Sequence, residues 1–348
     1  MNSSFHPGKV WLDNHGDRIQ AHGGSVLFHQ GKYYWYGENK EKTTGQSKIW
    51  HWGVRCYSST DLYNWDSEGI IIPPDLSDPH SPLYPESMMD RPHIIYNPLT
   101  HQFVAWLKVM GERGSFAILT ADAITGPYTL KHAHYNPCGL DVGDFDLTVE
   151  ADRAYLISQK PHQSVYIADL DDTYTEASGY YTEHLHRSGP PFAREAPAYF
   201  KRGEMHYLLT SGTTGYHPNP SELVCAQDIH GPYRLLTDPH VDDHTDTSFN
   251  SQISSVLKVA GKDLYIAIAD RWVPNLAETE GEKFSSGEGY AQTADKFKRM
   301  FDPSIQFELT AEDLAAMRIN SSISDYVWLP ISFESGQPQI IWQDEWQL

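Results

Sequence analysis

A repeated pattern of short apolar strands constrains the fold of this chain more than any other feature of its sequence. Each unit is about 50–70 residues long, a period typical of propellers and solenoids. A unit opens with an apolar strand, turns into an aromatic strand and closes with further short strands. The sequence Gly-Pro-Tyr recurs at matching places, as Gly126-Pro127-Tyr128 in the second unit and Gly231-Pro232-Tyr233 in the fourth. Because such an echo is hard to obtain by chance, we interpret the units as structural repeats.

Five units can be placed in order along the chain. Their first apolar runs begin near Gly24, Arg91, Gly143, Glu195 and Ser251. Five units of about four short strands each, separated by turn residues, predict an all-β, five-bladed β-propeller. A two-sheet sandwich is the alternative, but it does not explain the repeated Gly-Pro-Tyr. Residues 1–348 are expected to form a single propeller domain.

The fifth unit is interrupted by a long polar segment at about residues 275–322. This segment is rich in Glu, Lys, Ser and Gly. Near its end, residues 310–313 match a helix N-cap box, and Leu314, Met317 and Arg318 follow at helical spacing. The sequence therefore predicts an insertion with a short helix in the last blade. We interpret it as surface elaboration, with a lid as the alternative.

The net charge and the aromatic content of the chain argue against several classes of binding partner. A formal net charge of -20 argues against nucleic acid, whose phosphates demand a basic surface, and against anionic membrane surfaces. The aromatic load is heavy, with Trp 10, Tyr 21 and Phe 13, and it suits rings that stack on flat substrates. A neutral small molecule or glycan is the expected partner, and the oligomeric state stays open.

Cofactor signatures are absent from the sequence. The three cysteines, Cys56, Cys138 and Cys225, are too widely spaced for a disulfide framework or a CxxC zinc motif. There is no Walker or dinucleotide motif, no Gly-x-Ser-x-Gly elbow and no His-Glu-x-x-His. We therefore expect no cofactor and no metal site, although a structural ion such as calcium on the propeller axis is left open. The N-terminus shows no secretory signal pattern, which predicts a cytoplasmic location.

Polar side chains stand just before the apolar runs that open the five units. These residues are His22, Asp90, Asp144, Glu195 and Gln252. Singly, each would be interpreted as a solvated strand end. In a propeller, however, the first strand of every blade lines the axis, so the set is expected to meet in one cavity. Glu195 is followed by Ala196 and Pro197, and the proline is expected to hold Ala196 in extended geometry.

Grouped carboxylates are what glycosidic bond cleavage requires. One acid protonates the leaving oxygen, and a second group activates water or attacks C1. Burial and mutual repulsion keep one carboxyl protonated near neutral pH. Aromatic side chains near the rim are candidates for stacking on sugar faces, with burial in the blade core as the alternative for Trp35 and Trp106. They are Trp35, Trp52, Trp106, Tyr216 and Trp272.

Together these motifs resemble glycoside hydrolase family 43, and most closely its exo-β-1,3-galactanase branch. The resemblance extends over all five units. It is carried by residues 21–24, 33–38, 91–97, 194–197, 210–212, 250–252, 270–272 and 326–330.

The resemblance implies that Glu195 is the general acid of an inverting hydrolysis and that Gln252 holds the nucleophilic water. Most of the family carries an aspartate base in the first blade, but this chain reads His22-Gly23-Gly24 there, as the galactanase branch does. Asp90 stands where the galactanase branch usually has a glutamate. In the branch, that glutamate is considered as the base or as the group that orients the water. A neutral amide is a poor base, so Gln252 needs help from a neighbouring carboxylate. The sequence leaves the choice between Gln252 and Asp90 open.

The resemblance also places residues around the sugar. Glu38 and Asp144 match acidic positions of the glycone pocket, and Tyr216 stands where tryptophan is common. Further candidates for substrate contacts are His22, His93, Thr213, Arg271 and Trp272. The implied activity is an exo-acting, inverting glycoside hydrolase that releases a terminal sugar, most simply galactose, from β-1,3-galactan-type oligosaccharides. The alternatives are a glycosidase acting on arabinofuranosides or xylosides, and a non-catalytic glycan-binding propeller.

Overall fold

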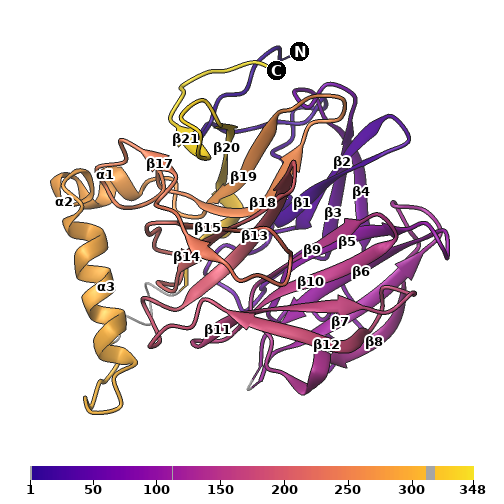
Figure 1. Ribbon diagram of the computed structural model, residues 1–348, viewed down its shortest axis with the longest axis horizontal. Coiled ribbons are helices and arrows are strands. Elements are labelled where there is room, and N and C mark those ends of the chain that lie inside the picture. The colour runs from indigo at the N-terminus through magenta and orange to yellow at the C-terminus, as the bar shows by residue number, and fades with distance from the viewer. Residues whose placement is uncertain (1, 112, 311–317) are drawn as a thin grey trace.

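Consecutive strands of the chain form separate sheets that are arranged around a common axis (Figure 1). The computed structural model describes residues 2–111, 113–310 and 318–348. The first blade contains β1 (His22–His29), β2 (Lys32–Glu38), β3 (Val54–Ser59) and β4 (Asp66–Ile72). The second contains β5 (Met89–Asn97), β6 (Gln102–Val109), β7 (Ser115–Ala121) and β8 (Thr129–Tyr135). The third contains β9 (Phe145–Glu150), β10 (Arg153–Lys160), β11 (Ser164–Leu170) and β12 (Ala177–His184).

The remaining strands complete the fourth and fifth blades. The fourth blade contains β13 (Arg194–Arg202), β14 (Met205–Gly212), β15 (Glu222–Ala226) and β16 (Arg234–Leu235). The fifth contains β18 (Gln252–Lys258), β19 (Tyr265–Arg271), β20 (Asp325–Ser332), β21 (Gln339–Ile341) and β17 (His240–Val241). Each inner strand contacts the inner strand of the next blade, and β18 contacts β1, which closes the ring. The predicted five-bladed β-propeller is therefore confirmed.

The fifth blade has an outermost strand that the repeat pattern did not reveal. β17 precedes the blade in sequence and pairs in parallel with β21, whereas its sheet neighbours pair antiparallel. The two chain ends meet beside this blade, where Phe5 bridges to Trp346 and their rings stack with centroids 4.2 Å apart. Both termini accordingly lie close together at the same edge of the molecule (Figure 1).

The repeated Gly-Pro-Tyr forms the same corner in two blades. It lies between the third and fourth strands of the second blade and of the fourth blade. Tyr128 donates its hydroxyl hydrogen to the carbonyl of Ile124 at 3.0 Å, and Tyr233 donates to Ile229 at 2.9 Å. The repeated tripeptide thus corresponds to a corner that is repeated in the structure.

A β-bulge stands at the start of four of the inner strands. The register shifts between His22 and Ser25, Asp90 and His93, Glu195 and Ala198, and Ile253 and Ser255. Inside these bulges Arg91 and Ala196 both have a φ of 48°. The expectation of extended geometry at Ala196 is therefore wrong, because the bulge requires a left-handed residue at this point. Bulges re-aim side chains, and here they precede the strands that line the axis.

The core lies between neighbouring blades. Trp35 and Trp106 are fully buried, Trp35 in a cluster with Trp65 and Trp328, and Trp106 in one with Phe116. Both belong to the core and not to a sugar-binding rim. Full burial of a large apolar side chain stabilises a fold by roughly 1.5–3 kcal/mol.

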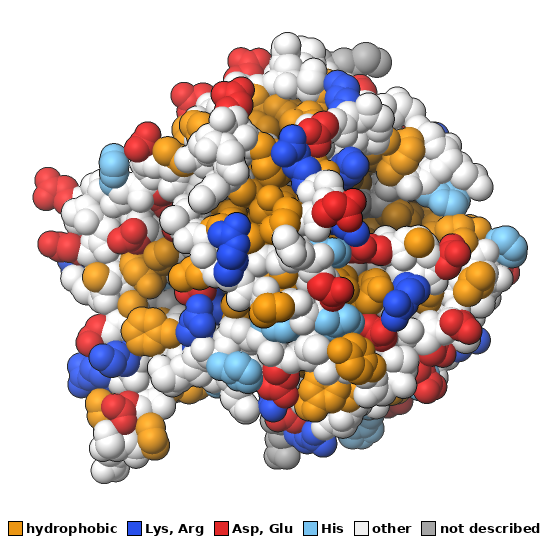
Figure 2. Space-filling model, viewed as in Figure 1, with side chains coloured by type: hydrophobic (Ala, Val, Ile, Leu, Met, Phe, Trp, Pro, Cys, Tyr) orange, Lys and Arg blue, Asp and Glu red, His pale blue; other side chains and the backbone are white. Residues whose placement is uncertain are grey.

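The insertion forms helices that project from one side of the propeller (Figure 1). They are α1 (Leu276–Glu280), α2 (Glu282–Ser285) and α3 (Glu288–Met300). The helix predicted from residue 310 onward falls largely on 311–317, which lie outside the described residues. The helices in the described part of the chain are too short or too polar for a bilayer crossing. Figure 2 shows acidic and basic side chains interspersed over the visible face, without a basic stripe there.

Candidate active site

One mouth of the propeller holds a pocket of about 220 Å³. Four of the five residues predicted to converge from the blade starts line it, together with side chains from second strands and loops. The lining residues are Glu38, Trp50, Asp90, Arg91, Lys108, Met110, Asp144, Glu195, Gly215, Tyr216, Gln252 and Trp272. We call this space the reaction-centre pocket.

On one side of the pocket, cations hold two carboxylates. The Lys108 ammonium lies 2.6 Å from Asp144 and 3.1 Å from Asp90, and Arg91 Nε lies 2.9 Å from Asp144. Burial opposes ionisation of Asp144, but Arg91 and Lys108 outweigh it and lower its pKa to about 2. The same carboxylates raise the pKa of Lys108 above its usual range in spite of burial. Asp144 and Lys108 are therefore charged at neutral pH.

The carboxyl of Glu195 lies in a different environment. Burial raises its pKa to about 8, and the negative charge of Asp144 adds to the effect, against the opposing charges of Arg91, Lys108 and Arg194. A carboxyl with this pKa is mostly protonated at neutral pH. Gln252 Nε2 donates to Glu195 Oε1 at 3.2 Å. Because that oxygen accepts a hydrogen bond, the proton of Glu195 is expected on Oε2.

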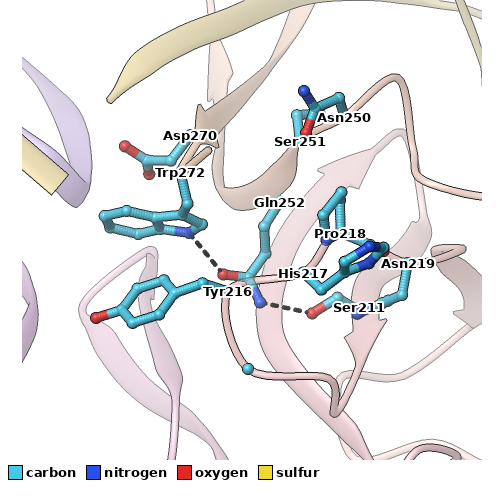
Figure 3. A pocket seen from close by; sticks show the side chains of 11 residues that line it. Ser211, Tyr216, His217, Pro218, Asn219, Asn250, Ser251, Gln252, Asp270 and Trp272 are labelled. Atoms are coloured by element: carbon cyan, nitrogen blue, oxygen red, sulfur yellow. Dashed lines mark hydrogen bonds between the residues drawn. The ribbon is translucent and has the colours of Figure 1, made fainter. Parts of the chain in front are cut away.

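The side-chain amide of Gln252 is fixed at both ends. Its oxygen accepts from Arg91 at 2.6 Å and from the Trp272 indole at 3.1 Å, and its nitrogen donates to Ser211 at 2.9 Å as well as to Glu195. Figure 3 shows the amide between the Trp272 ring and Ser211, with Tyr216 beside it. Arginine and indole N–H groups are donors only, so the amide cannot flip without losing both bonds.

Asp90 is held in place in a similar way. One of its oxygens accepts from the Trp50 indole at 2.6 Å, and the other lies near Lys108. Glu38, by contrast, is fully enclosed, where Lys40 lies 2.7 Å from it and the Arg91 backbone N–H donates to it at 2.8 Å. Burial raises the pKa of Glu38 to about 7, in spite of Lys40. The pocket thus gathers carboxyl groups of clearly different acidity.

Comparison with models of protein families shows to which family this chain belongs. The family model "Glycosyl hydrolases family 43" matches residues 20–273. The chain belongs to glycosyl hydrolases family 43. A comparison with curated proteins finds no match.

Solved structures of family 43 members share the fold over the whole chain. A family 43 β-1,3-galactosidase is 30% identical with a TM-score of 0.77, and the match covers 100% of this chain but 64% of that one. A second β-1,3-galactosidase, solved with galactodeoxynojirimycin, is 27% identical with a TM-score of 0.77 and is covered completely, with 99% of this chain. An exo-β-1,3-galactanase from Phanerochaete chrysosporium, 24% identical, has a TM-score of 0.77 over 100% of this chain and 68% of its own, and supports the fold alone.

Within this family 43 propeller, several residues predicted to contact substrate lie outside the pocket wall. His22 is fully buried between Asp270, 2.9 Å from its Nδ1, and Tyr326. Thr213 donates to the Ala193 carbonyl at 2.9 Å, and Arg271 donates to the carbonyls of residues 249 and 250. These side chains lie behind the residues that line the pocket and support them.

His93 faces a different part of the axis. Its Nε2 lies 3.3 Å from Asp146, and both side chains line a separate cavity of about 270 Å³. Burial lowers the pKa of His93 to about 4 and raises that of Asp146 to about 7. Both groups are therefore neutral between about pH 4 and about pH 7. A bulge separates His93 from Asp90, since the register shifts between them.

Sequence reasoning missed Lys108 and Trp50. Lys108 is a single charge within the apolar run of β6 and is only 7% exposed, and a lysine in such a run is a signal for buried carboxylate partners. Trp50 lies in an irregular loop, where no strand pattern pointed to it. The tryptophan that was predicted, Trp52, is covered by the Lys42 ammonium at 3.3 Å from its ring centroid.

The insertion supports the loop that carries Tyr216. His217 and Glu280 of α1 are joined by a hydrogen bond of 3.0 Å. Gly215 has a φ of +60°, and a Cβ there would lie 3.4 Å from the ring of Phe297 in α3. The helices therefore pack behind one wall of the reaction-centre pocket. The insertion is thus more than a surface elaboration, because it contacts the loop that carries Tyr216.

Proposed function

We propose that the protein is an exo-acting, inverting glycoside hydrolase that releases terminal galactose from β-1,3-linked galacto-oligosaccharides. Membership of family 43 supports glycoside hydrolysis, and the two similar β-1,3-galactosidases favour a β-1,3-galactosidic bond.

The observation that carries the proposal is the Glu195 carboxyl, which is held by Gln252 next to Asp144 and has a pKa raised to about 8 by burial and by the Asp144 charge. Cleavage of a glycosidic bond needs an acid that still holds its proton at neutral pH. Glu195 gives this proton to the oxygen of the leaving sugar as the bond to C1 breaks. Asp144 stays ionised, so its negative charge also favours the positive charge that develops on the sugar ring.

Water attacks C1 from the opposite face and must lose a proton. Gln252 donates to Glu195 and accepts from two fixed donors, so in this mechanism it positions the acid and does not take the proton. Asp90 is the carboxylate assigned to accept the proton. Its contacts with Trp50 and Lys108 hold the carboxylate in place.

The shape of the pocket supports release of one terminal sugar. Its inner wall is made of buried charged side chains, among them Arg91, Lys108 and Asp144, which block extension of a chain in that direction. Hydroxyl groups of a single ring can bond to these side chains, while Tyr216 and Trp272 offer apolar faces. A cavity of about 220 Å³ lies below the range of about 300–1,000 Å³ for sites of larger ligands.

The decisive experiment is a substrate screen with product analysis. Purified protein is incubated with β-1,3- and β-1,6-galacto-oligosaccharides and with aryl galactosides, arabinofuranosides and xylosides. We expect galactose from the β-1,3-linked chains, and proton NMR should show the α-anomer first. Initial release of the β-anomer would overturn inversion, and preferential turnover of an arabinofuranoside or xyloside would overturn the galactose assignment.

A glycan-binding protein without turnover is the second candidate. It is favoured by the fact that both oxygens of Asp90 already have partners. Measurable galactose binding together with no hydrolysis of any substrate in the screen would support it against the enzyme.

A further inference from the structure

The loop at residues 213–219, which we call the Tyr216 loop, places Tyr216 at the border of the reaction-centre pocket (Figure 3). The centroid of the Tyr216 ring lies 5.5 Å from that of Trp272 and 6.4 Å from that of Trp50. Side chains on loops are placed less precisely than side chains on strands, unless other contacts hold the loop. The position of this ring therefore depends on what holds the Tyr216 loop.

The base of the loop is held by hydrogen bonds within the fourth blade. Asn219 Nδ2 donates to the Gly212 carbonyl at 2.9 Å and to Thr214 Oγ1 at 2.7 Å. The Thr214 hydroxyl in turn donates to the His217 carbonyl at 2.6 Å. These bonds fix the residues on either side of Tyr216 but do not include the tyrosine itself.

The insertion holds the loop from the outside, through a side chain of α1. His217 Nε2 lies 3.0 Å from Glu280 Oε1, and the two side chains are only 15% and 24% exposed. The other ring nitrogen of His217, Nδ1, lies 3.0 Å from the Pro218 carbonyl oxygen, which can only accept. The imidazole therefore makes both bonds when each ring nitrogen carries a hydrogen. Glu280 thus joins the insertion to the residue that directly follows Tyr216.

The second oxygen of Glu280 faces helix α3. Oε2 is buried and has no hydrogen-bond partner among the described residues. It lies against Gly289 in the first turn of α3, where any Cβ would collide with it. A negative charge is favoured beside a helix N-terminus, which compensates for the missing partner. The carboxylate is therefore enclosed between the Tyr216 loop and α3, in a space that a glycine leaves open.

This connection lies outside the part of the chain that the family model matches. The match ends at residue 273, whereas the helices of the insertion begin at Leu276. Glu280 also does not line the reaction-centre pocket. Any effect that it has on the substrate must therefore pass through the Tyr216 loop.

We propose that Glu280 is a positioning residue for the substrate, because it acts through His217 to hold Tyr216 as a wall for the terminal sugar. This role rests on the proposed function, since it requires a sugar in the reaction-centre pocket. The insertion then raises the affinity for the substrate without taking part in bond cleavage.

Kinetics of full-length variants on β-1,3-galactotriose test this role. Glu280→Ala should raise KM about 5- to 10-fold and leave kcat within about 2-fold, because a wall of this kind binds ground state and transition state alike. Glu280→Gln should keep KM within about 2-fold of wild type, since its amide can donate to His217. Gly289→Ala displaces the same carboxylate from the side of α3 and should raise KM about 3-fold, although alanine favours the helix. Glu278→Ala is the matched control, because Glu278 is exposed on the same helix, and its KM should not change.

A double-mutant cycle separates positioning from a general structural role. Tyr216→Ala should raise KM at least as much as Glu280→Ala, and Glu280→Ala added to Tyr216→Ala should change KM by less than about 2-fold further. Hydrogen exchange followed by mass spectrometry gives a measurement that needs no substrate. The amides of the Tyr216 loop should exchange at least about 5-fold faster in Glu280→Ala, and at the wild-type rate in Glu278→Ala.

The outcomes distinguish this role from the proposed function. An unchanged KM or unchanged exchange in Glu280→Ala overturns the positioning role and leaves the proposed function standing. The same holds for full additivity with Tyr216→Ala, or for an equal effect of Glu278→Ala. Wild-type protein that neither hydrolyses the triose nor binds galactose overturns the proposed function, and the role of Glu280 in substrate binding with it.

Discussion

The two sides of the reaction-centre pocket shift the pKa of a carboxyl group in opposite directions. Asp144, at the start of the third blade, lies against Lys108 and Arg91, and its pKa falls to about 2. Glu195, at the start of the fourth blade, bonds to a neutral amide, and its pKa rises to about 8. Asp144 is buried and Glu195 is partly buried, and burial raises the pKa of both carboxyls, so burial alone does not decide their protonation. The direct contacts with cations decide it, and they create an acid beside a permanent anion.

The largest expected effect comes from removing the acid. Glu195→Gln should lower kcat on a β-1,3-galacto-oligosaccharide by about 10²–10⁴-fold, because the amide has no proton of suitable acidity to give. Kinetics with a dinitrophenyl galactoside supply the comparison. Its leaving group needs no protonation, so the loss on this substrate should be at least about 10-fold smaller. Equal losses on both substrates would show that Glu195 is not the acid.

The second effect tests the cationic side through stability. Lys108→Met leaves Asp90 and Asp144 without their shared partner, and the free energy of unfolding should fall by about 3 kcal/mol. The matched control is Lys160→Met. Lys160 pairs with Glu183 at 3.3 Å but is partly exposed, so the loss should be under about 1 kcal/mol. Urea denaturation followed by fluorescence measures both, and similar losses would contradict the contrast between the two sides.

The third effect concerns the amide that joins Glu195 to Arg91. Gln252→Ala should lower kcat by about 10²-fold, since the acid loses its positioning contact. The conservative change Gln252→Glu should not restore activity, because a second carboxyl would compete for the Arg91 charge. Wild-type rates for Gln252→Ala would show that this amide does not position the acid.

The smallest effect is a pH dependence. Glu195 must be protonated to act, so kcat/KM should fall as pH rises through about 8, by about 10-fold per pH unit above it. Between the usual pKa of glutamic acid and about 8, the folded protein binds more protons at Glu195 than the unfolded chain, so this group makes stability fall as pH rises. Asp144 acts in the opposite sense. Its contribution is present above the usual aspartate range and is lost as pH falls toward about 2. A decline in kcat/KM that begins near pH 5 would contradict the raised pKa of Glu195.

Much of the site follows from the repeat pattern. The blade starts identified Asp90, Asp144, Glu195 and Gln252 as neighbours, and the structure brings their side chains into one pocket. His22 occupies an equivalent place but is turned into a buried pair with Asp270. The strands of His22, Asp90 and Glu195 share the same one-residue bulge, so the difference lies in the partners of His22, which are Asp270 and Tyr326.

The sequence alone determined the five blades, since alternating apolar strands and a repeated Gly-Pro-Tyr leave few other ways to bury the core. It also determined that polar groups cluster at one mouth. Only the tertiary structure decided which carboxyl is ionised, because Lys108 comes from a second strand and Arg91 crosses to the third blade. It likewise decided that Trp50 borders the site and that the insertion supports it. Contacts of this kind depend on distances between segments remote in sequence, and such distances leave no periodic pattern in the chain.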